Sequence, residues 1–516
     1  MRPYIFNRVG TINIPNVKWA DGVICFGLSN NNLYTALFVL ISRQLKVSSK
    51  IRSDFIVTGS INGSVGVSWV SVFKRSSIIN WWVSNQWLRI SGSFMDRIAF
   101  RNCDILHPID DLRDWVKSRE LWDSLKFRAG HPQITIDEID YTDLVVDSYL
   151  RFKPDYRFDV NHPFVRLIIW QLLRNIRKSS VYFSKVKPLA YLSPYSSYVE
   201  FGVAVRIALK IGIPVWSFGG FPRVAKRLSL NDFYHTFYDN QYLAQFEKLD
   251  KQSERLDEAD KMLASRLSGI VDPATSYMSF SAYSGSDYKL TEDVTGAVVI
   301  FLHDFSDNYN CYPNAIFIDY FSWLCFTIET LQSAGKLFYL KSHPNQKANV
   351  TCANKILSKK YSNLKWLDIK VKTTELVQNG MVCGVTIFGT IAHELAYLGI
   401  PTISAGDNPH INFGFCRIAK SVAEYKIMLE SPDFLPIPKN EMRRQALIFY
   451  YMRNLYVNPE ELAFCKAYSL MYHEFNKNRG SEKDIIHAMK QFVSCNDFNK
   501  LINDILEGGN KINIYK

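Results

Sequence analysis

The segment VCGVTIFGTIAHELAYLGIPTISA, from Val382 to Ala405, decides the fold that we predict for this chain. It reads as strand, turn, helix and strand, because the apolar run Val385–Phe388 is followed by apolar residues at helical spacing. Gly399 and the proline two residues later end the helix, since glycine adopts positive φ and proline keeps the chain extended. A helix that begins on Gly389 and Thr390 presents unpaired N–H groups and a positive dipole end, which suit a phosphate.

A second segment strengthens the case for nucleotide binding. Strand-turn-helix-strand order is common to α/β domains, so the first segment alone leaves nucleotide binding and a plain scaffold equally open. Upstream, FYLKSHPN reads as a buried strand whose end carries Lys341, His343 and Pro344. Ligands of open α/β sheets bind at the carboxyl ends of strands, so we expect a cation, an imidazole and a helix N-terminus to converge on one anion. Glu394, one turn into the helix, is placed to accept hydrogen bonds from ribose hydroxyls.

The K-x-H-P after a strand, followed by G-T-x-x-x-E-x-x-x-x-G-x-P, resembles the C-terminal half of GT-B glycosyltransferases. The likeness is greatest to bacterial enzymes that assemble capsule and lipopolysaccharide O-chains. It implies an α/β fold with two Rossmann-like domains that face each other across a cleft. It also implies a donor site: Lys341, His343, Pro344, Gly389 and Thr390 for the phosphates, and Glu394 for the ribose. The nucleotide-sugar is a co-substrate in such enzymes, so the resemblance implies no cofactor and no metal ion.

A matching unit lies in the first half of the chain. The stretch LAYLSPYSSYVEFGVAVRIALKIGIPVWSF, from Leu189 to Phe218, ends its helix on the same Gly-Ile-Pro as the first segment. We interpret the two units as halves of two Rossmann-like domains and not as a solenoid repeat. We therefore expect residues 1–285 to form an acceptor-side domain and 286–470 a nucleotide-sugar domain. Residues 471–516 are expected to be helices that return to the first domain.

Glycosyl transfer needs a group that takes the proton of the acceptor hydroxyl. Glu200, after the Ser-rich turn of the first domain, is one candidate, and an aspartate within 140–147 is another. The acidic segment is also typical of a solvated helix face. His303 and Asp304 follow an apolar run that predicts a strand buried on both faces, so we expect them beside the cleft. His303 suits donor contact or acid/base work, with a turn-capping role as its alternative.

Two loops leave further alternatives open. Asp304 and Asp307 would be the pair to hold a divalent metal, but GT-B enzymes generally do without one. His410 and Asn412 follow the second strand of the opening segment and are expected over the donor sugar. A plain surface loop fits these two residues equally well.

Composition restricts the class of protein and its partners. A chain of 516 residues is too long for one core, and 47% hydrophobic residues support well-buried domains. The net charge of +12 favours anionic partners, such as nucleotide-sugars, polyanionic glycans or the inner membrane surface, although a basic surface without a partner remains an alternative. No RNP motif or zinc finger supports nucleic-acid binding. Without a signal peptide or a membrane-spanning stretch, we expect a cytoplasmic protein with peripheral contact at the inner face of the cytoplasmic membrane.

These observations predict a glycosyltransferase that moves a sugar from a nucleotide-sugar donor to a growing surface polysaccharide, capsule or lipopolysaccharide O-chain. The acceptor is expected to be a glycan or a lipid-linked glycan. Two alternatives share the fold: a CMP-Kdo or sialic-acid-type transferase, and a teichoic-acid-type polyol phosphotransferase. A more remote alternative is a non-catalytic protein that binds nucleic acid or glycan.

Overall fold

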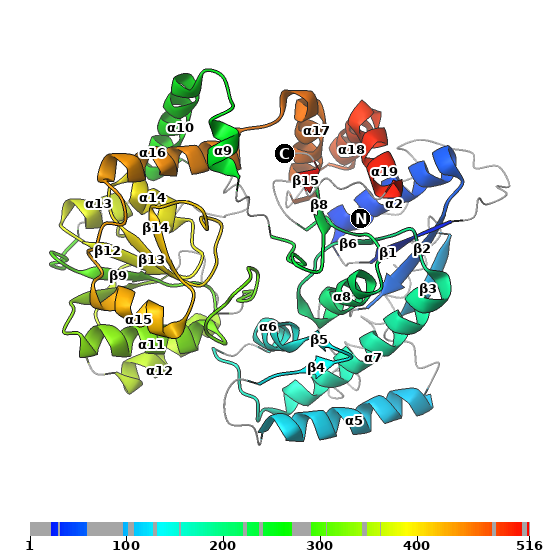
Figure 1. The fold of residues 1–516 in the computed structure, drawn as a ribbon, viewed down its shortest axis with the longest axis horizontal. Coiled ribbons are helices and arrows are strands. Elements are labelled where there is room, and N and C mark those ends of the chain that lie inside the picture. The colour runs from blue at the N-terminus through cyan, green and yellow to red at the C-terminus, as the bar shows by residue number, and fades with distance from the viewer. Residues whose placement is uncertain are drawn as a thin grey trace. The chain divides into compact units, whose positions relative to one another are not determined.

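The computed structural model divides the chain into two compact units (Figure 1). Unit 1 comprises residues 1–153, 159–236 and 457–516, and unit 2 comprises residues 154–158 and 237–456. The structure describes residues 22–28, 31–58, 96–101, 108–126, 132–153, 156–219, 224–236, 241–270, 290–305, 307–342, 348–361, 363–476, 481–507 and 513–514.

Unit 2 is built on a six-stranded parallel sheet in the order β11-β10-β9-β12-β13-β14. Its strands are β9 (Val298–Phe301), β10 (Phe338–Lys341), β11 (Trp366–Leu367), β12 (Cys383–Thr386), β13 (Thr402–Ala405) and β14 (Cys416–Ala419). The strand order proceeds outward from β9 on one side and from β12 on the other. That is the doubly wound Rossmann order, so the predicted fold of this domain is confirmed.

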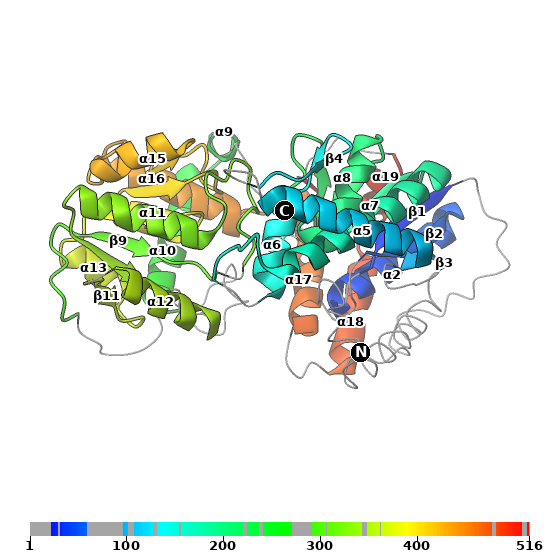
Figure 2. The ribbon, with the colours of Figure 1, turned by 90° about the horizontal axis from the view of Figure 1, so that it is seen from below.

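Helices cover both faces of this sheet. The helices of unit 2 in the described residues are α9 (Tyr242–Phe246), α10 (Gln252–Leu267), α11 (Tyr320–Ser333), α12 (Ala348–Lys360), α13 (Thr373–Gln378), α14 (Ile391–Tyr397), α15 (Val422–Glu430) and α16 (Lys439–Tyr450), with a π-helical turn η3 (Tyr451–Leu455). Ile300, Leu340 and Val385 pack against α11, α12 and α15, which lie in a row across one face (Figure 2). Val299 and Tyr339 point to the other face, where α13 and α14 lie.

The segment that decided the prediction folds as expected. It contains β12, α14 and β13, in that order. Gly399 has φ of 76° and lies just after α14, so it ends this helix in the left-handed conformation that glycine favours. A further layer, made of α10 and α16, packs outside α14. The helix is thus buried between the sheet and two other helices.

Unit 1 contains a seven-stranded sheet in the order β15-β8-β7-β6-β1-β2-β3. Its strands are β1 (Val23–Gly27), β2 (Arg52–Val57), β3 (Arg97–Arg101), β6 (Ala190–Ser193), β7 (Val215–Ser217), β8 (Ala225–Leu228) and β15 (Asn513–Ile514), and β4 (Thr135–Ile136) pairs with β5 (Ile139–Asp140) outside the sheet. The five strands from β3 to β7 are parallel and doubly wound, whereas β8 and β15 are antiparallel additions. The second predicted Rossmann-like domain is therefore also present.

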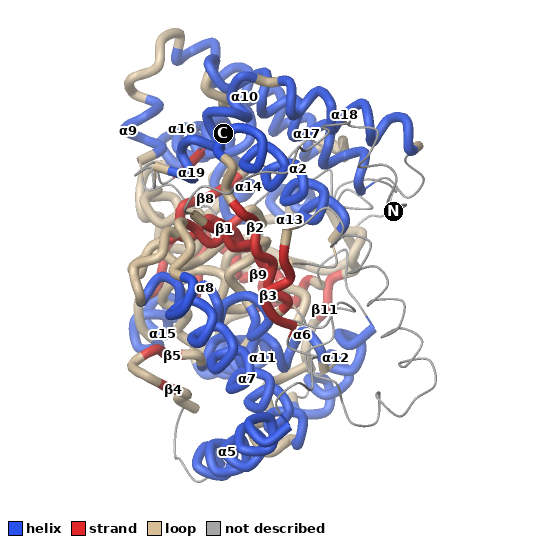
Figure 3. Tube along the Cα trace, turned by 90° about the vertical axis from the view of Figure 1, so that its right-hand side faces the viewer, coloured by secondary structure: helices blue, strands red, loops and turns tan. Residues whose placement is uncertain are grey.

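The sheet of unit 1 also lies between helices (Figure 3). They are α2 (Asn32–Ser49), α5 (Pro108–Lys126), α6 (Thr142–Phe152), α7 (Pro163–Val186), α8 (Val203–Lys210), α17 (Leu462–Asn476), α18 (Glu482–Ser494) and α19 (Asn496–Leu506), with a π-helical turn η1 (Tyr198–Gly202) and a 3-10 turn η4 (Pro459–Glu461). On one face, α2 and α17 to α19 share a core with β1 and β2. On the other, α7 packs through a ring contact between Phe183 and Tyr191. Within the described ranges, no helix is long and apolar enough to cross a bilayer.

The unit boundaries differ from the expected ones. The first domain was expected to extend to residue 285, but residues 237–270 group with unit 2 because α9 and α10 pack on α16 and η3. At the other end, unit 2 stops at residue 456 and not at 470, since α17 packs on α2. Most of the stretch that was expected to connect the domains, 271–289, lies outside the described residues.

Candidate functional site

Two loops meet where the strand order of unit 2 reverses. β9 and β12 are neighbours in the sheet, although two strands separate them in the chain. The loop after β9 carries His303 and Asp304, and the turn after β12 carries Gly389 and Thr390. Ligands of doubly wound sheets bind outside the carboxyl ends of the strands at this switch point. The topology thus brings four of the predicted site residues to the place where a ligand is expected.

His303 is joined directly to the turn after β12. Its Nε2 lies 3.0 Å from Thr386 Oγ1, and the backbone N–H of Ile387 points at the same nitrogen at 3.4 Å. A nitrogen that accepts from a backbone N–H is unprotonated, so the neutral ring carries its proton on Nδ1. The ring also stacks on Tyr320, with centroids 5.2 Å apart, and contacts Phe388. His303 is therefore held in one orientation on three sides.

Gly389 leaves no room for a side chain at this point. Its N–H donates to Thr386 Oγ1 at 3.3 Å, and a Cβ added here would lie only 2.8 Å from that oxygen. The same added atom would lie 3.7 Å from Cε1 of His303. Thr386 thus links the turn to the histidine. Thr386 was not among the predicted site residues, although its place at the end of β12, just before the Gly-Thr turn, was a signal for it.

Thr390 and the start of α14 are less favourable for a phosphate than expected. Thr390 is exposed and has helical dihedral angles, but its side chain caps no backbone N–H. The helix proper has only seven residues, from Ile391 to Tyr397. Because a macrodipole builds up over successive turns, a helix this short contributes little of it. Any anion at this turn would depend mainly on individual donors.

Glu394 does not lie open to a ribose. The residue is 3% exposed, and its Oε1 accepts from Nε and Nη2 of Arg266, at 2.9 and 2.7 Å. Arg266 comes from α10 and is itself buried. The geometry assigns this carboxylate to an internal ion pair between α14 and α10, so the ribose-binding role expected for it is wrong. The periodicity of the helix could not reveal the distant arginine.

The structure describes only the first two residues of the K-x-H-P motif. Lys341 is buried at the end of β10, where its Nζ donates to the carbonyl of Ile369 at 3.1 Å. Burial lowers the pKa of Lys341 to about 8, against the opposing effect of Asp368. The ammonium group thus points toward the segment after β11, the edge strand, and not toward His303. His343 and Pro344 lie outside the described residues.

His410 is part of a buried histidine pair and not of an open loop. Nδ1 of His393, on α14, lies 3.4 Å from Nε2 of His410, and both rings pack against Phe449. His393 Nε2 and His410 Nδ1 are buried without a hydrogen-bond partner. Burial lowers the pKa of each imidazole well below 6.5, so both are neutral at pH 7. The role over the donor sugar expected for His410 is therefore wrong.

Asp304 is half-buried in the turn after β9, where its carbonyl accepts from the backbone N–H of Asp307 at 3.0 Å. Its place at the switch point agrees with the expected position, and its chemical role stays a prediction. Among the side chains that the structure describes, no group of three or more His, Cys, Asp or Glu is arranged to hold a metal ion.

Unit 1 has a switch point of its own, between β1 and β6. Gly27 ends β1, and a Cβ on it would lie 2.6 Å from the hydroxyl of Tyr191 and 3.5 Å from Cδ of Pro194. The Ser-rich turn after β6 therefore lies directly against the end of β1. Glu200 follows in the π-helical turn η1, where it is 5% exposed and its carbonyl accepts from Thr58 Oγ1. The sequence prediction placed Glu200 at this edge, and its role as the base stays a prediction.

A histidine missed in the sequence supports this turn. Nδ1 of His235 lies 2.9 Å from Ser197 Oγ and 3.4 Å from Ser196 Oγ. Burial lowers the pKa of His235 to about 4, and the charge of Lys226 acts in the same direction. The neutral ring is thus a hydrogen-bond partner of the turn. Its neighbours in the sequence show no periodic pattern that would have indicated this contact.

The carboxylates of Asp140 and Asp143, in the acidic segment 140–147, form contacts within unit 1. Asp140 lies before α6 and not on it, and it accepts from the backbone N–H of Thr142 at 2.8 Å. Asp143 forms a two-pronged ion pair with the buried Arg206 of α8. Asp147 is 1% exposed. The alternative of a solvated helix face does not hold for Asp143 and Asp147, and the role of one of these aspartates as the base stays a prediction.

Neither protein-family models nor curated protein sequences give a match to this chain. Among solved structures, UDP-GlcNAc 2-epimerase from Neisseria meningitidis bound to UDP-GlcNAc is 10% identical, covering 82% of this chain and 97% of that chain at a TM-score of 0.24. MurG from Acinetobacter baumannii is 9% identical, with coverages of 94% and 99% and a TM-score of 0.22. Glycosyltransferase VinC in complex with dTDP is 8% identical, with coverages of 94% and 99% and a TM-score of 0.21. Scores this low carry no argument about function, so the conclusions below depend on the chain's own residues.

Proposed function

We propose that this chain is a metal-independent GT-B glycosyltransferase that transfers a sugar from a nucleotide-sugar to a growing surface polysaccharide, of the capsule or O-chain class. One observation carries the proposal: His303, Thr386 and Gly389 are bonded together at the switch point of a Rossmann-ordered sheet. Nucleotides bind at this place in open α/β sheets.

In the proposed reaction, negative charge develops on the donor's terminal phosphate as the glycosidic bond breaks. Fixed donors that point at this charge lower the barrier, because they need no reorganisation during the reaction. His303 is fixed by Thr386 and Tyr320, and its imidazole is the group that we assign to the donor's phosphate. The Gly389-Thr390 turn allows the phosphate to approach the backbone closely, since Gly389 has no side chain.

Unit 1 is proposed to bind the acceptor, a glycan or lipid-linked glycan, with Glu200 as the base that takes the proton of the attacking hydroxyl. Its position beside the switch point of the second sheet supports this assignment. We further propose that the enzyme works at the cytoplasmic face of the membrane, where the net charge of +12 favours contact with anionic lipids. The nucleotide-sugar is then a co-substrate, and no cofactor is required.

A thermal-shift experiment tests the donor site. Purified protein is heated with UDP, GDP, CDP, CMP or dTDP, because a ligand that binds only the folded state raises the melting temperature. We expect one nucleotide to raise the melting temperature of the wild type but to have little effect on His303→Ala and on His343→Ala. The exposed His473→Ala, on α17, is the matched control and should respond like the wild type.

The outcomes separate the alternatives. A response to CMP but not to UDP, GDP or dTDP would favour a Kdo- or sialic-acid-type donor or the polyol phosphotransferase, and a phosphodiester in the product would identify the latter. If no nucleotide stabilises the wild type, the donor site is wrong. The two sheets would then be a scaffold for another function.

A further inference from the structure

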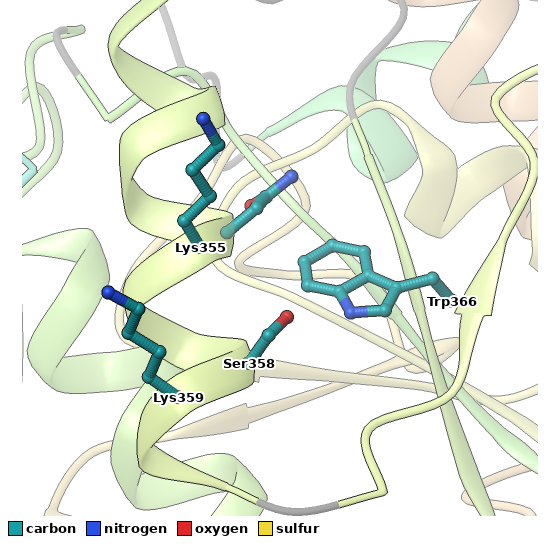
Figure 4. Close-up of a pocket in the computed structure, with 5 residues that line it drawn as sticks. Lys355, Ser358, Lys359 and Trp366 are labelled. Carbon is teal, nitrogen blue, oxygen red and sulfur yellow. The ribbon is translucent and has the colours of Figure 1, made fainter.

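A groove of about 440 Å³ lies at the edge of the unit 2 sheet, between α12 and the edge strand β11 (Figure 4). The residues that line it are Asn354, Lys355, Ser358, Lys359 and Trp366. Figure 4 shows Ser358 on the side of the helix that faces the indole of Trp366, while the two lysines extend along the outside of the helix. The groove is shallow and open to solvent, so it suits a chain that lies along the surface and not a small molecule enclosed by the protein.

Several polar groups around this groove have no partner within the part of the chain that the structure describes. Asn354 Oδ1 is buried and has no hydrogen-bond partner. Within the described part of the chain, no residue accepts a hydrogen bond from the indole N–H of Trp366, and no carboxylate pairs with Lys355 or Lys359. The next lysine on the helix, Lys360, differs in that it pairs with Glu329 at 3.1 Å. Because the Asn354 oxygen is closed to solvent, we expect a ligand in the groove to contact the indole, the Ser358 hydroxyl and the two unpaired ammonium groups instead.

These groups together fit one chemical class. An indole offers a flat apolar surface with a polar edge, which suits the C–H face of a sugar ring. The exposed hydroxyl of Ser358 matches sugar hydroxyls, which both donate and accept hydrogen bonds. The ammonium groups of Lys355 and Lys359 would attract carboxylates or phosphates on neighbouring sugars. We propose that the groove between α12 and β11 binds a segment of an acidic polysaccharide.

The groove is separate from the loops that carry His303 and Gly389. β11 is three strand positions from β12, so the two strands are about 14 Å apart at the usual spacing of 4.7–4.9 Å between neighbours. Trp366 also lies on the face covered by α11, α12 and α15, whereas α14 lies on the other face. The inference therefore goes beyond the proposed function and does not depend on it. If both hold, the groove would retain the growing polymer on the enzyme between rounds of transfer.

The test measures binding of defined oligosaccharides to the full chain by isothermal titration calorimetry. The acidic probes are hexasaccharides of hyaluronan, polymannuronate and polysialic acid, and maltohexaose is the neutral probe. We expect at least one acidic hexasaccharide to bind, more weakly at 300 mM than at 50 mM salt because salt screens the lysines. Maltohexaose should bind at least tenfold more weakly.

Variants locate the site. Trp366→Ala should weaken binding at least tenfold, and Trp366→Phe, which keeps an aromatic face but loses the N–H, should bind with intermediate affinity. Lys355→Ala/Lys359→Ala changes only exposed side chains, so it should fold normally and still lose affinity for the acidic probe. The matched control is Lys426→Ala/Lys439→Ala, two exposed lysines elsewhere in unit 2, which should bind like the wild type.

Three results would overturn the inference: no acidic hexasaccharide binds, binding is unchanged in both groove variants, or UDP competes with the saccharide. The last result would show that the groove belongs to a nucleotide site. Failure of this inference is distinguishable from failure of the proposed function, because the groove variants should keep the nucleotide-induced thermal shift of the wild type.

Discussion

Arg266 contacts one carboxylate oxygen of Glu394 twice, through Nε at 2.9 Å and Nη2 at 2.7 Å. The two side chains are 7% and 3% exposed, so water contributes little to the solvation of either charge. The pair joins α10, which lies before the sheet in the chain, to α14, which follows β12. It therefore fixes the helix that carries the Gly389-Thr390 turn at its start.

Breaking this pair should destabilise unit 2. Arg266→Leu leaves the Glu394 carboxylate buried without its partner, for which we expect a loss of about 3–5 kcal/mol in the free energy of unfolding. Arg266→Leu/Glu394→Leu removes both charges and should regain most of that loss. Urea unfolding monitored by tryptophan fluorescence measures these differences. Arg444→Ala, from an exposed pair with Glu441, is the control and should change stability by less than about 1 kcal/mol. Equal effects of Arg266→Leu and Arg444→Ala would contradict the assignment.

Thr386→Val tests the link between the turn and His303. Valine keeps the shape of threonine, but it cannot accept the hydrogen bond from the N–H of Gly389 or form one with Nε2 of His303. We expect the affinity for the stabilising nucleotide to fall about tenfold, equivalent to about 1.4 kcal/mol. Titration calorimetry measures the affinity. Thr327→Val removes a buried hydroxyl on α11, away from the switch point, and should leave the affinity unchanged.

Gly389→Ala should damage the same site by steric conflict. The new methyl group would lie 2.8 Å from Thr386 Oγ1 and 3.2 Å from Cγ2 of Ile391, so the turn must shift. The expected outcome is a loss of nucleotide-induced stabilisation in the thermal-shift assay, with the unliganded melting temperature lowered by a few degrees. Gly414→Ala is the matched control, because its methyl group would meet only side-chain atoms at 3.3 Å or more. A full nucleotide response in Gly389→Ala would contradict the proposed close approach of a phosphate.

The histidine pair predicts loss of stability in mild acid. Burial depresses the pKa of His393 and His410 in the folded state, whereas both have values near 6.5 when unfolded. The unfolded chain therefore binds more protons below pH 6.5. Stability is fully present above that pH and is lost as the pH falls from 6.5 toward the folded pKa values. Between pH 6.5 and 5.5 the two groups should cost about 2 kcal/mol together.

Urea unfolding at each pH measures this loss. His410→Phe removes one of the two titrating groups in a site lined by Phe449 and Phe415, so the loss of stability between pH 6.5 and 5.5 should become smaller by about 1 kcal/mol. His473→Ala removes an exposed histidine and should leave the acid dependence as in the wild type. An unchanged acid dependence in His410→Phe would show that other groups cause it.

Local patterns predicted the sheets and the ends of their helices well. The continuous apolar run before His303 became β9, and the Gly-Ile-Pro stops fell where α14 and α8 end. Parallel strands of a doubly wound sheet meet at one edge, so topology alone brought His303 to Gly389. Side-chain direction was not predictable in this way. Glu394 and Lys341 stand at the expected positions, but their charges are satisfied by Arg266 and Ile369, whose proximity depends on tertiary packing.

The predicted domain boundaries differ from the observed ones for a related reason. A polar, Gly- and Ser-rich stretch predicts a linker, but it does not say on which domain the helix before it packs. The apolar residues of α10, among them Leu263 and Leu267, find their partners on α16, nearly two hundred residues later. Only the folded structure reveals such a pairing.

The composition of unit 1 from separate stretches of chain has a consequence for biosynthesis. All strands of its sheet except β15 come from residues before 229, yet α17 to α19 supply one wall of its core and come after the whole of residues 237–456. At about 5–20 residues per second on the ribosome, the interval lasts on the order of ten seconds or more. During that time Phe26, Phe55 and Leu192 lack their final cover. The nascent first unit therefore exposes apolar surface while the second unit is already able to fold. We expect chaperones to bind the first unit during this interval.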